Sequence, residues 1–201
     1  MKEQENTLSI SELQPDFLGF IFWKDSKRYC KNVIEVLPDS IQKVGVFVDA
    51  DYNEIVDKII SHKLNFIQLH GEETADFCLK MKKTNTKVIK AITIDSDFNF
   101  NELKYDINCV DYFLFDTKGK LPGGNGTTFD WEILNEYNQD VPYFLSGGIG
   151  VDELTKLQKF LQSEAAKKCF AIDINSQFED DFGIKNKQKI KEFQEKLNQM
   201  R

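Results

Sequence analysis

The sequence has few of the residues that hold metal centres or small extracellular domains together. Its 201 residues include four cysteines and two histidines. The cysteines, at positions 30, 78, 109 and 169, are widely spaced and form no C-x-x-C pair. A disulfide framework or a zinc site is therefore not expected. We interpret Cys30, Cys78, Cys109 and Cys169 as reduced thiols that mostly contribute to packing.

Long apolar runs and an excess of positive charge are also absent. No stretch approaches the roughly 20 apolar residues that a membrane helix needs, and no basic segment followed by an apolar one opens the chain. A formal charge of −7 without a concentrated basic patch argues against nucleic acid as a partner. We expect a cytoplasmic protein that acts on a small molecule, without nucleic acid or membrane partners.

The dominant pattern is the alternation of short apolar runs with amphipathic segments. With 41% hydrophobic and 29% charged residues, the chain suits one globular domain spanning residues 1–201. Runs rich in Val, Ile and Phe alternate with segments of helical period, which is typical of βα units around a parallel sheet. The expected strands are Phe17–Phe22, Lys43–Val48, Phe66–Leu69, Val88–Ile94, Tyr112–Phe115, Tyr143–Leu145 and Phe170–Ile174.

The segments between these runs predict eight helices from their 3.6-residue apolar period. The first lies around residues 8–13, weaker ones follow Lys31 and surround Glu102, and a short one follows Trp131. Asn186 is expected to cap the last helix. Eight helices and seven strands, with a helix first, favour an α/β protein of the (βα)8 TIM-barrel type whose first strand is absent from this chain. The alternative, an open doubly wound sheet, usually has a glycine-rich turn after its first strand, whereas the glycines here come late.

Two loops at the carboxyl ends of neighbouring strands predict an anion site. "LSGGIG" contains Gly147 and Gly148, which let backbone N–H groups approach an anion closely, and "DINSQFE" contains Asn175 and Ser176. These positions match the usual phosphate site of a barrel, after its last two strands. A tight turn with a loop serine is the simpler alternative. We expect a phosphorylated substrate.

Asp116 ends an apolar strand and is the candidate general acid. A carboxyl at the mouth of an apolar barrel is partly desolvated, which lets it hold and donate a proton. A turn or cap residue is the equally weighted alternative. The loop that follows suits a mobile lid because of its glycines, which are Gly119, Gly123, Gly124 and Gly126.

Three further polar groups follow other strands. Arg28 in "SKRY" could clamp a carboxylate with its guanidinium fork, although a solvated surface arginine is the simpler reading. His70 in "QLHGEE" has no second histidine at metal-ligand spacing, so we expect it to line the mouth of the barrel. The acidic run at residues 179–181 is expected to be a solvated loop.

These blocks together resemble one enzyme family. "PDFLGFIFWKDSKRY", "VGVFVD", "IQLHGEE", "VIKAI", "FDTK", "GGNGTTFDW", "LSGGI" and "AIDINSQFE" occur in the order found in phosphoribosylanthranilate isomerases of tryptophan biosynthesis. The likeness covers nearly the whole chain, and "GTTFDW" followed by "LSGG" is its most distinctive part.

The resemblance implies an Amadori rearrangement of N-(5-phosphoribosyl)anthranilate, without metal or organic cofactor. It implies that Asp116 protonates the ring oxygen and that Arg28 pairs with the anthranilate carboxylate. It also implies that Asp173 supports the site. The remaining substrate-binding positions that we assign are Gly147, Gly148, Asn175 and Ser176 at the phosphate, with His70 and Gly124 lining the site.

One element of the family pattern does not carry over. The family's general base is a cysteine in a first-strand motif of the form K-x-C-G-[MI], and Met1 falls where the last residue of that motif would lie. Cys30 is the one cysteine expected near the mouth, and we give it little weight as a base. Two alternatives stay open: a phosphate-ligand binder that has lost its base, and the related histidine-pathway isomerase, which has half-barrel repeats not seen here. We expect a monomer or a homodimer.

Overall fold

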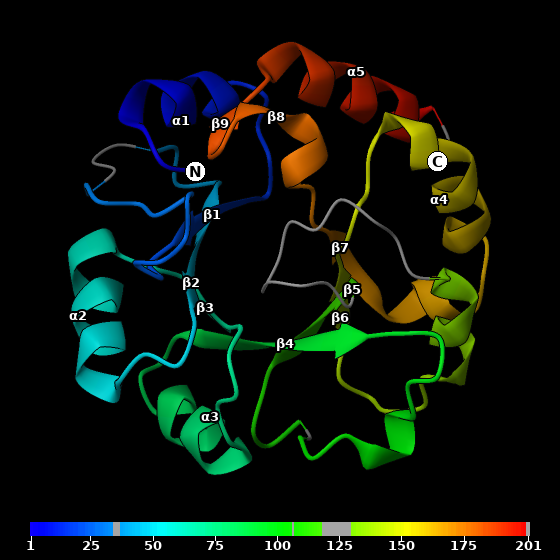
Figure 1. Ribbon diagram of the computed structural model, residues 1–201, viewed down its shortest axis with the longest axis horizontal. Coiled ribbons are helices and arrows are strands. Elements are labelled where there is room, and N and C mark those ends of the chain that lie inside the picture. Colours follow the sequence, from blue (N-terminus) through cyan, green and yellow to red (C-terminus); the bar gives the residue numbers. More distant parts are fainter. Residues whose placement is uncertain (34–36, 106, 118–129, 200–201) are drawn as a thin grey trace.

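Seven parallel strands form one curled sheet in which each strand pairs with the next one along the chain (Figure 1). The computed structural model describes residues 1–33, 37–105, 107–117 and 130–199. Because the strand order never reverses, the doubly wound alternative is wrong. The strands are β1 (Phe17–Ile21), β2 (Gln42–Phe47), β3 (Phe66–Leu69), β4 (Lys87–Ile94), β5 (Tyr112–Thr117), β6 (Tyr143–Leu145) and β7 (Cys169–Ile172).

All seven predicted strands are confirmed, with ends shifted by at most two residues. β3 and β6 have the predicted bounds, whereas β5 extends to Thr117 and so includes Asp116 within the strand. Within the described ranges, β1 and β7 are the two edges of the sheet. The described residues therefore show a curled parallel sheet of seven strands, which agrees with the predicted α/β class, whereas the closed barrel with a missing first strand stays a prediction.

The helices lie on the outside of the curled sheet (Figure 1). The α-helices of the described residues are α1 (Gln4–Ser11), α2 (Tyr52–His62), α3 (Ala75–Lys82), α4 (Leu154–Leu161) and α5 (Lys187–Asn198). Short 3₁₀ turns add η1 (Phe100–Glu102), η2 (Trp131–Glu136), η3 (Val151–Glu153), η4 (Ala165–Lys168) and η5 (Ser176–Phe178). None of the helices in this described part is long and apolar enough to cross a membrane.

The prediction of eight α-helices is wrong in two places. The predicted helix after Lys31 falls on a segment that includes residues 34–36, which lie outside the described residues, whereas the segments around Glu102 and after Trp131 form 3₁₀ turns. Each of these two 3₁₀ segments has few residues between turn-forming neighbours, too few for hydrogen bonds to offset helix nucleation. The predicted cap is confirmed, because Asn186 accepts a hydrogen bond from the N–H of Lys189 at 2.9 Å.

The two faces of the sheet bury different side chains. Residues such as Phe20 and Phe113 belong to the large cluster that packs under the helices, whereas Phe66 and Leu114 belong to a smaller cluster on the opposite, inner face. Successive residues of a strand point to opposite faces. Asp116 therefore shares the inner face with Leu114, at the carboxyl end of β5, and this places its side chain in the mouth of the curled sheet.

A small hairpin follows β7, where a solvated loop was expected. It consists of β8 (Glu179–Asp181) and β9 (Ile184–Lys185), and it lies beside α1 (Figure 1). The side-chain amide of Asn6 pairs with the backbone of Lys185 in both directions, at 2.8 and 2.9 Å. The expectation is wrong for Glu179, whose side chain is only 6% exposed, because it is held by cations that are distant in sequence.

Candidate active site

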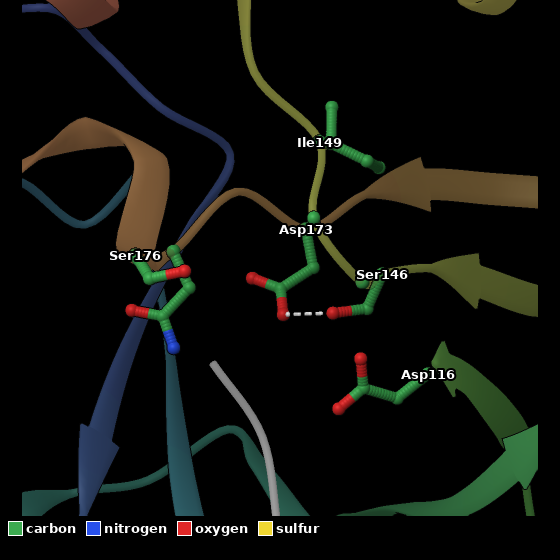
Figure 2. Close-up of a pocket in the computed structure, with 8 residues that line it drawn as sticks. Asp116, Ser146, Ile149, Asp173 and Ser176 are labelled. Atoms are coloured by element: carbon green, nitrogen blue, oxygen red, sulfur yellow. Dashed lines mark hydrogen bonds between the residues drawn. The ribbon is translucent and has the colours of Figure 1, made fainter. Parts of the chain in front are cut away.

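A pocket opens at the carboxyl ends of β5, β6 and β7, where polar side chains converge (Figure 2). It brings together six of the predicted site residues, from the end of β5 and from the loops that follow β6 and β7. They are Asp116, Gly147, Gly148, Asp173, Asn175 and Ser176, and Ser146 and Ile149 complete the lining.

Asp116 is buried on the inner face of β5. Its Oδ1 accepts a hydrogen bond from the N–H of Thr117 at 2.9 Å, and its Oδ2 lies 3.6 Å from Nε2 of His70. Figure 2 shows the carboxylate pointing toward the side chains of Ser146 and Asp173. The group therefore faces the pocket while its backbone is fixed in the sheet.

His70 lies beside Asp116, at the end of β3, and Gln68 holds its ring. Nε2 of Gln68 lies 2.8 Å from Nδ1 of His70. In this arrangement the amide donates to Nδ1, so the ring proton is on Nε2, the atom that faces Asp116. His70 therefore lies next to the pocket through Asp116 but is not among the residues that line it, and its role at the mouth stays a prediction. Gln68 was not singled out in the sequence, although its place two residues earlier on the same strand face was a usable signal.

Ser146 and Asp173 form a hydrogen-bonded pair across β6 and β7. Oγ of Ser146 donates to Oδ2 of Asp173 at 3.0 Å (Figure 2). The Asp173 side chain keeps some exposed surface, but its surroundings desolvate the carboxyl and raise its pKa. The Ser146 hydrogen bond and the charge of Lys185 act in the opposite direction. Ser146 was missed in the sequence, where it stands directly before the glycine pair.

The glycine pair after β6 adopts a backbone that other residues rarely take. Gly147 has φ of 93° and Gly148 has φ of 65°. A Cβ at position 147 would lie 2.2 Å from Oγ1 of Thr117 and 2.7 Å from its backbone nitrogen. Consecutive left-handed residues can present backbone N–H groups to an anion. The loop is therefore compatible with the predicted phosphate site.

The loop after β7 supplies Asn175 and Ser176 to the pocket, and hydrogen bonds from Lys185 hold this loop in place. Nζ of Lys185 donates to the backbone oxygen of Asn175 at 2.9 Å and to its Oδ1 at 2.5 Å. Burial lowers the pKa of Lys185, and the carboxylate of Glu179 opposes that effect. This lysine was not identified in the sequence, because its role depends on the hairpin that returns it to the pocket.

Arg28 does not line the pocket but is linked to it. Its Nε lies 3.0 and 2.9 Å from the two carboxylate oxygens of Glu179, and its Nη2 lies 2.7 Å from Oε2. Glu179 also accepts a hydrogen bond from Nζ of Lys185 at 3.0 Å. Thus the predicted carboxylate clamp is paired with an acid of the chain itself. Gly124 lies outside the described residues.

None of the four cysteines lines this pocket. Cys30 is fully buried and burial raises its pKa. Burial also raises the pKa of Cys78, within α3, and that of Cys169, at the start of β7, to about 12 each. Buried thiols with raised pKa values are poor bases near neutral pH.

Comparisons with known proteins agree with this architecture. The family model described as N-(5'phosphoribosyl)anthranilate (PRA) isomerase matches residues 1–196. A protein named N-(5'-phosphoribosyl)anthranilate isomerase from Parabacteroides distasonis is 36% identical over 199 residues, covering 96% of this chain and 88% of the relative. One of the same name from Phocaeicola vulgatus is also 36% identical, covering 99% of this chain and 95% of the relative.

Solved structures share the fold. A phosphoribosyl anthranilate isomerase from Thermotoga maritima superposes with a TM-score of 0.78 at 28% identity, covering 99% of this chain and 96% of that one. Another structure of such an isomerase, solved with reduced 1-(o-carboxyphenylamino)-1-deoxyribulose 5-phosphate, has a TM-score of 0.76 at 26% identity, covering 99% of this chain and 95% of that one. With a family model that matches residues 1–196 and relatives that align over nearly its whole length, this chain belongs to the N-(5'-phosphoribosyl)anthranilate isomerase family.

Proposed function

We propose that this protein isomerises N-(5'-phosphoribosyl)anthranilate to 1-(2-carboxyphenylamino)-1-deoxyribulose 5-phosphate in tryptophan biosynthesis. The observation that carries the proposal is the pocket that holds Asp116 together with the glycine pair after β6. A carboxyl that can donate a proton, next to a loop suited to an anion, fits a phosphorylated sugar. The family membership and the names of the relatives support the same reaction.

The chemistry begins with proton donation by Asp116. In its protonated form this carboxyl gives its proton to the ring oxygen of the sugar, the C1–O bond breaks, and an iminium forms between C1 and the anthranilate nitrogen. Loss of the C2 proton then gives an enolamine, which becomes the ketone by proton transfer. His70, 3.6 Å from Asp116, stabilises the carboxylate left after the first step.

The remaining assignments concern the residues that bind the phosphate end and the anthranilate end of the substrate. We assign the phosphate to the loops of Gly147, Gly148, Asn175 and Ser176, the anthranilate carboxylate to Arg28, and a supporting role to Asp173. We keep Gly124, which lies outside the described residues, as a proposed substrate-binding residue. A small phosphorylated molecule is thus the proposed partner, and the cytoplasm the proposed location.

The general base is the part of the mechanism that these residues leave unassigned. In the family that the sequence resembles, this base is a cysteine within a motif on the first strand. The given sequence does not contain that motif. Cys30 does not take its place, since the thiol is buried and its pKa is raised by burial. A binder that keeps phosphate affinity without turnover is therefore the alternative function.

We also propose that the sheet is part of an eight-stranded barrel, completed by a strand between β7 and β1. On the outer edge of β1, Gly19 O accepts a hydrogen bond from the α-amine of Met1. On the same edge Ile21 O accepts one from the N–H of Cys30 at 2.8 Å. Both oxygens lie on the edge of β1 at which an eighth strand would pair.

The test is direct assay of the purified protein. Product formation from N-(5'-phosphoribosyl)anthranilate, followed by chromatography against a protein-free control, supports the enzyme. Saturable binding of the reduced product analogue without turnover supports the binder, and absence of both overturns the proposal. Size-exclusion chromatography with light scattering distinguishes a monomer from a homodimer. One structural relative consists of monomers generated from an isomerase of Thermotoga maritima that is named as dimeric.

A further inference from the structure

One buried carboxylate joins the two edges of the sheet at the mouth of the pocket. Glu179 follows β7, and it binds Arg28, which follows β1, with three nitrogen–oxygen distances between 2.7 and 3.0 Å. It also binds Lys185 at 3.0 Å and accepts a hydrogen bond from the N–H of Gly183 at 3.2 Å. The side chain of Glu179 is 6% exposed and that of Lys185 is 10% exposed. These contacts are therefore largely shielded from water.

The carboxylate of Glu179 occupies one edge of the Arg28 guanidinium, and a second carboxylate could bind the other edge. A guanidinium has two edges that can bind a carboxylate with two nitrogens. Glu179 takes the edge formed by Nε and Nη2, so a ligand carboxylate would approach the edge formed by Nη1 and Nη2. The ring of Phe182 lies 5.0 Å from Cζ of Arg28 and supports the guanidinium plane. The group is thus oriented by contacts on its edge and on its face.

The carboxylate of Glu179 is shared by two cations. Arg28 and Lys185 both bind it, and the charge of Asp173 also acts on Lys185. Lys185 in turn holds Asn175 through its backbone oxygen and its Oδ1, and Asn175 lines the pocket. The cluster therefore connects the proposed carboxylate clamp with the proposed phosphate loop.

We propose that Glu179 is a positioning residue that orients Arg28 toward the carboxylate of the substrate, and so determines selectivity for a carboxyl-bearing aryl group. This inference rests on the proposed function, because it takes Arg28 as the clamp. Without Glu179, Arg28 would lose its fixed orientation and would stand near the ammonium of Lys185 with no shared carboxylate between them. Affinity for the carboxylate end of the ligand should then fall, while affinity for the phosphate end is kept.

The experiment measures binding of two ligands by calorimetry. One is the reduced product analogue, with its o-carboxyphenyl group, and the other is the same compound with an unsubstituted phenyl group. Glu179→Gln is expected to weaken binding of the carboxylated ligand about tenfold or more, and to leave the Kd of the phenyl ligand within about twofold. The matched control is Asp180→Asn, which removes the neighbouring carboxyl of the same hairpin, one that binds Asn186 and not Arg28, and it should change neither Kd.

Three outcomes contradict the inference in separable ways. If Glu179→Gln keeps the wild-type preference for the carboxylated ligand, the proposed role of Glu179 is wrong, but the assignment of Arg28 as the clamp is unaffected. Equal weakening of both ligands points to a general structural role and also overturns it. Equal binding of both ligands by the wild type overturns the clamp itself, and with it the assignment of Arg28 in the proposed function. If Glu179→Gln does not fold, Glu179→Asp, which keeps the negative charge but shortens the side chain that reaches Arg28, carries the same test without disturbing the contacts of Lys185 with Asn175.

Discussion

Nε2 of His70 lies 3.6 Å from Oδ2 of Asp116, and Gln68 holds the opposite ring nitrogen of His70 at 2.8 Å. The separation between His70 and Asp116 is longer than a hydrogen bond, so in this state their interaction is electrostatic. It becomes stronger when Asp116 loses its proton, because the ring N–H then faces a full negative charge. The charge of the Asp116 carboxyl, the proposed acid, is therefore coupled to the imidazole of His70 at the end of β3.

Replacement of His70 by alanine should lower kcat about 10-fold to 100-fold, since the imidazole that faces the Asp116 carboxylate and stabilises its charge is lost. The KM should change less, because the imidazole is expected to act on Asp116 more than on the bound substrate. Steady-state kinetics with N-(5'-phosphoribosyl)anthranilate checks the split between kcat and KM. A large rise in KM at constant kcat would instead make His70 a binding residue only.

Asp116→Asn should reduce turnover by about 10²–10⁴-fold, because the amide cannot donate the proton that opens the sugar ring. The amide can still accept the hydrogen bond from the N–H of Thr117 that Oδ1 accepts now, so the fold should be kept. Calorimetry with inorganic phosphate is the control and should give the wild-type affinity. Activity close to that of the wild type would remove the acid from Asp116.

Gly147→Ala should lower the free energy of unfolding by about 2–5 kcal/mol, because an added Cβ combines left-handed strain with overpacking against Thr117. Binding of phosphate should weaken as well. The matched control is Gly19→Ala, since nothing lies within 4 Å of a Cβ at that position and its φ is not in the left-handed region. That control should be neutral or stabilising by up to about 1 kcal/mol. Urea unfolding measures both, and equal effects would contradict the steric explanation.

Asp173→Asn should stabilise the protein at neutral pH. Because burial raises the pKa of Asp173 in the folded state, the folded protein binds this proton more tightly than the unfolded chain does. The free energy of unfolding of the wild type therefore falls as the pH rises from the unfolded pKa of Asp through the higher folded value. The difference between Asp173→Asn and the wild type should grow across that window and vanish below it. Urea unfolding at several pH values checks this, and a constant difference would assign the effect to something other than titration.

Extension of the chain in front of Met1 by a strand that carries the K-x-C-G motif should raise both stability and turnover. Such a strand would pair the edges of β7 and β1, and its cysteine would supply the base, whose absence typically costs about 10²–10⁴-fold in rate. The comparison is between the thermal midpoints and the isomerase activities of the two forms. A variant of the extended chain with serine in place of the cysteine should gain the same stability but should not gain the higher turnover rate. Equal stability and activity of the short and extended chains would show that no strand is needed there.

The sequence by itself determined the elements that depend on neighbouring residues. Alternation of apolar runs predicted all seven parallel strands, and the position of Asp116 at the end of such a run predicted its place at the mouth of the sheet. Asn186 was predicted as a cap because a cap depends on contacts three residues away. Gly147 and Gly148 were predicted as a close-approach turn because only a residue without Cβ adopts that backbone freely.

The tertiary structure decided which distant groups meet. Arg28 and Glu179 are 151 residues apart in the sequence, and no local pattern indicates that an acid expected in a solvated loop would be buried against this arginine. The pair Ser146–Asp173 and the contact of Lys185 with Asn175 likewise depend on how neighbouring strands and a returning hairpin are placed. Periodicity in a sequence reports which face of an element is buried, because burial follows the repeat of the helix or strand. It does not report which charge lies opposite, because that is fixed only when the sheet curls and brings the loops of its two edges together.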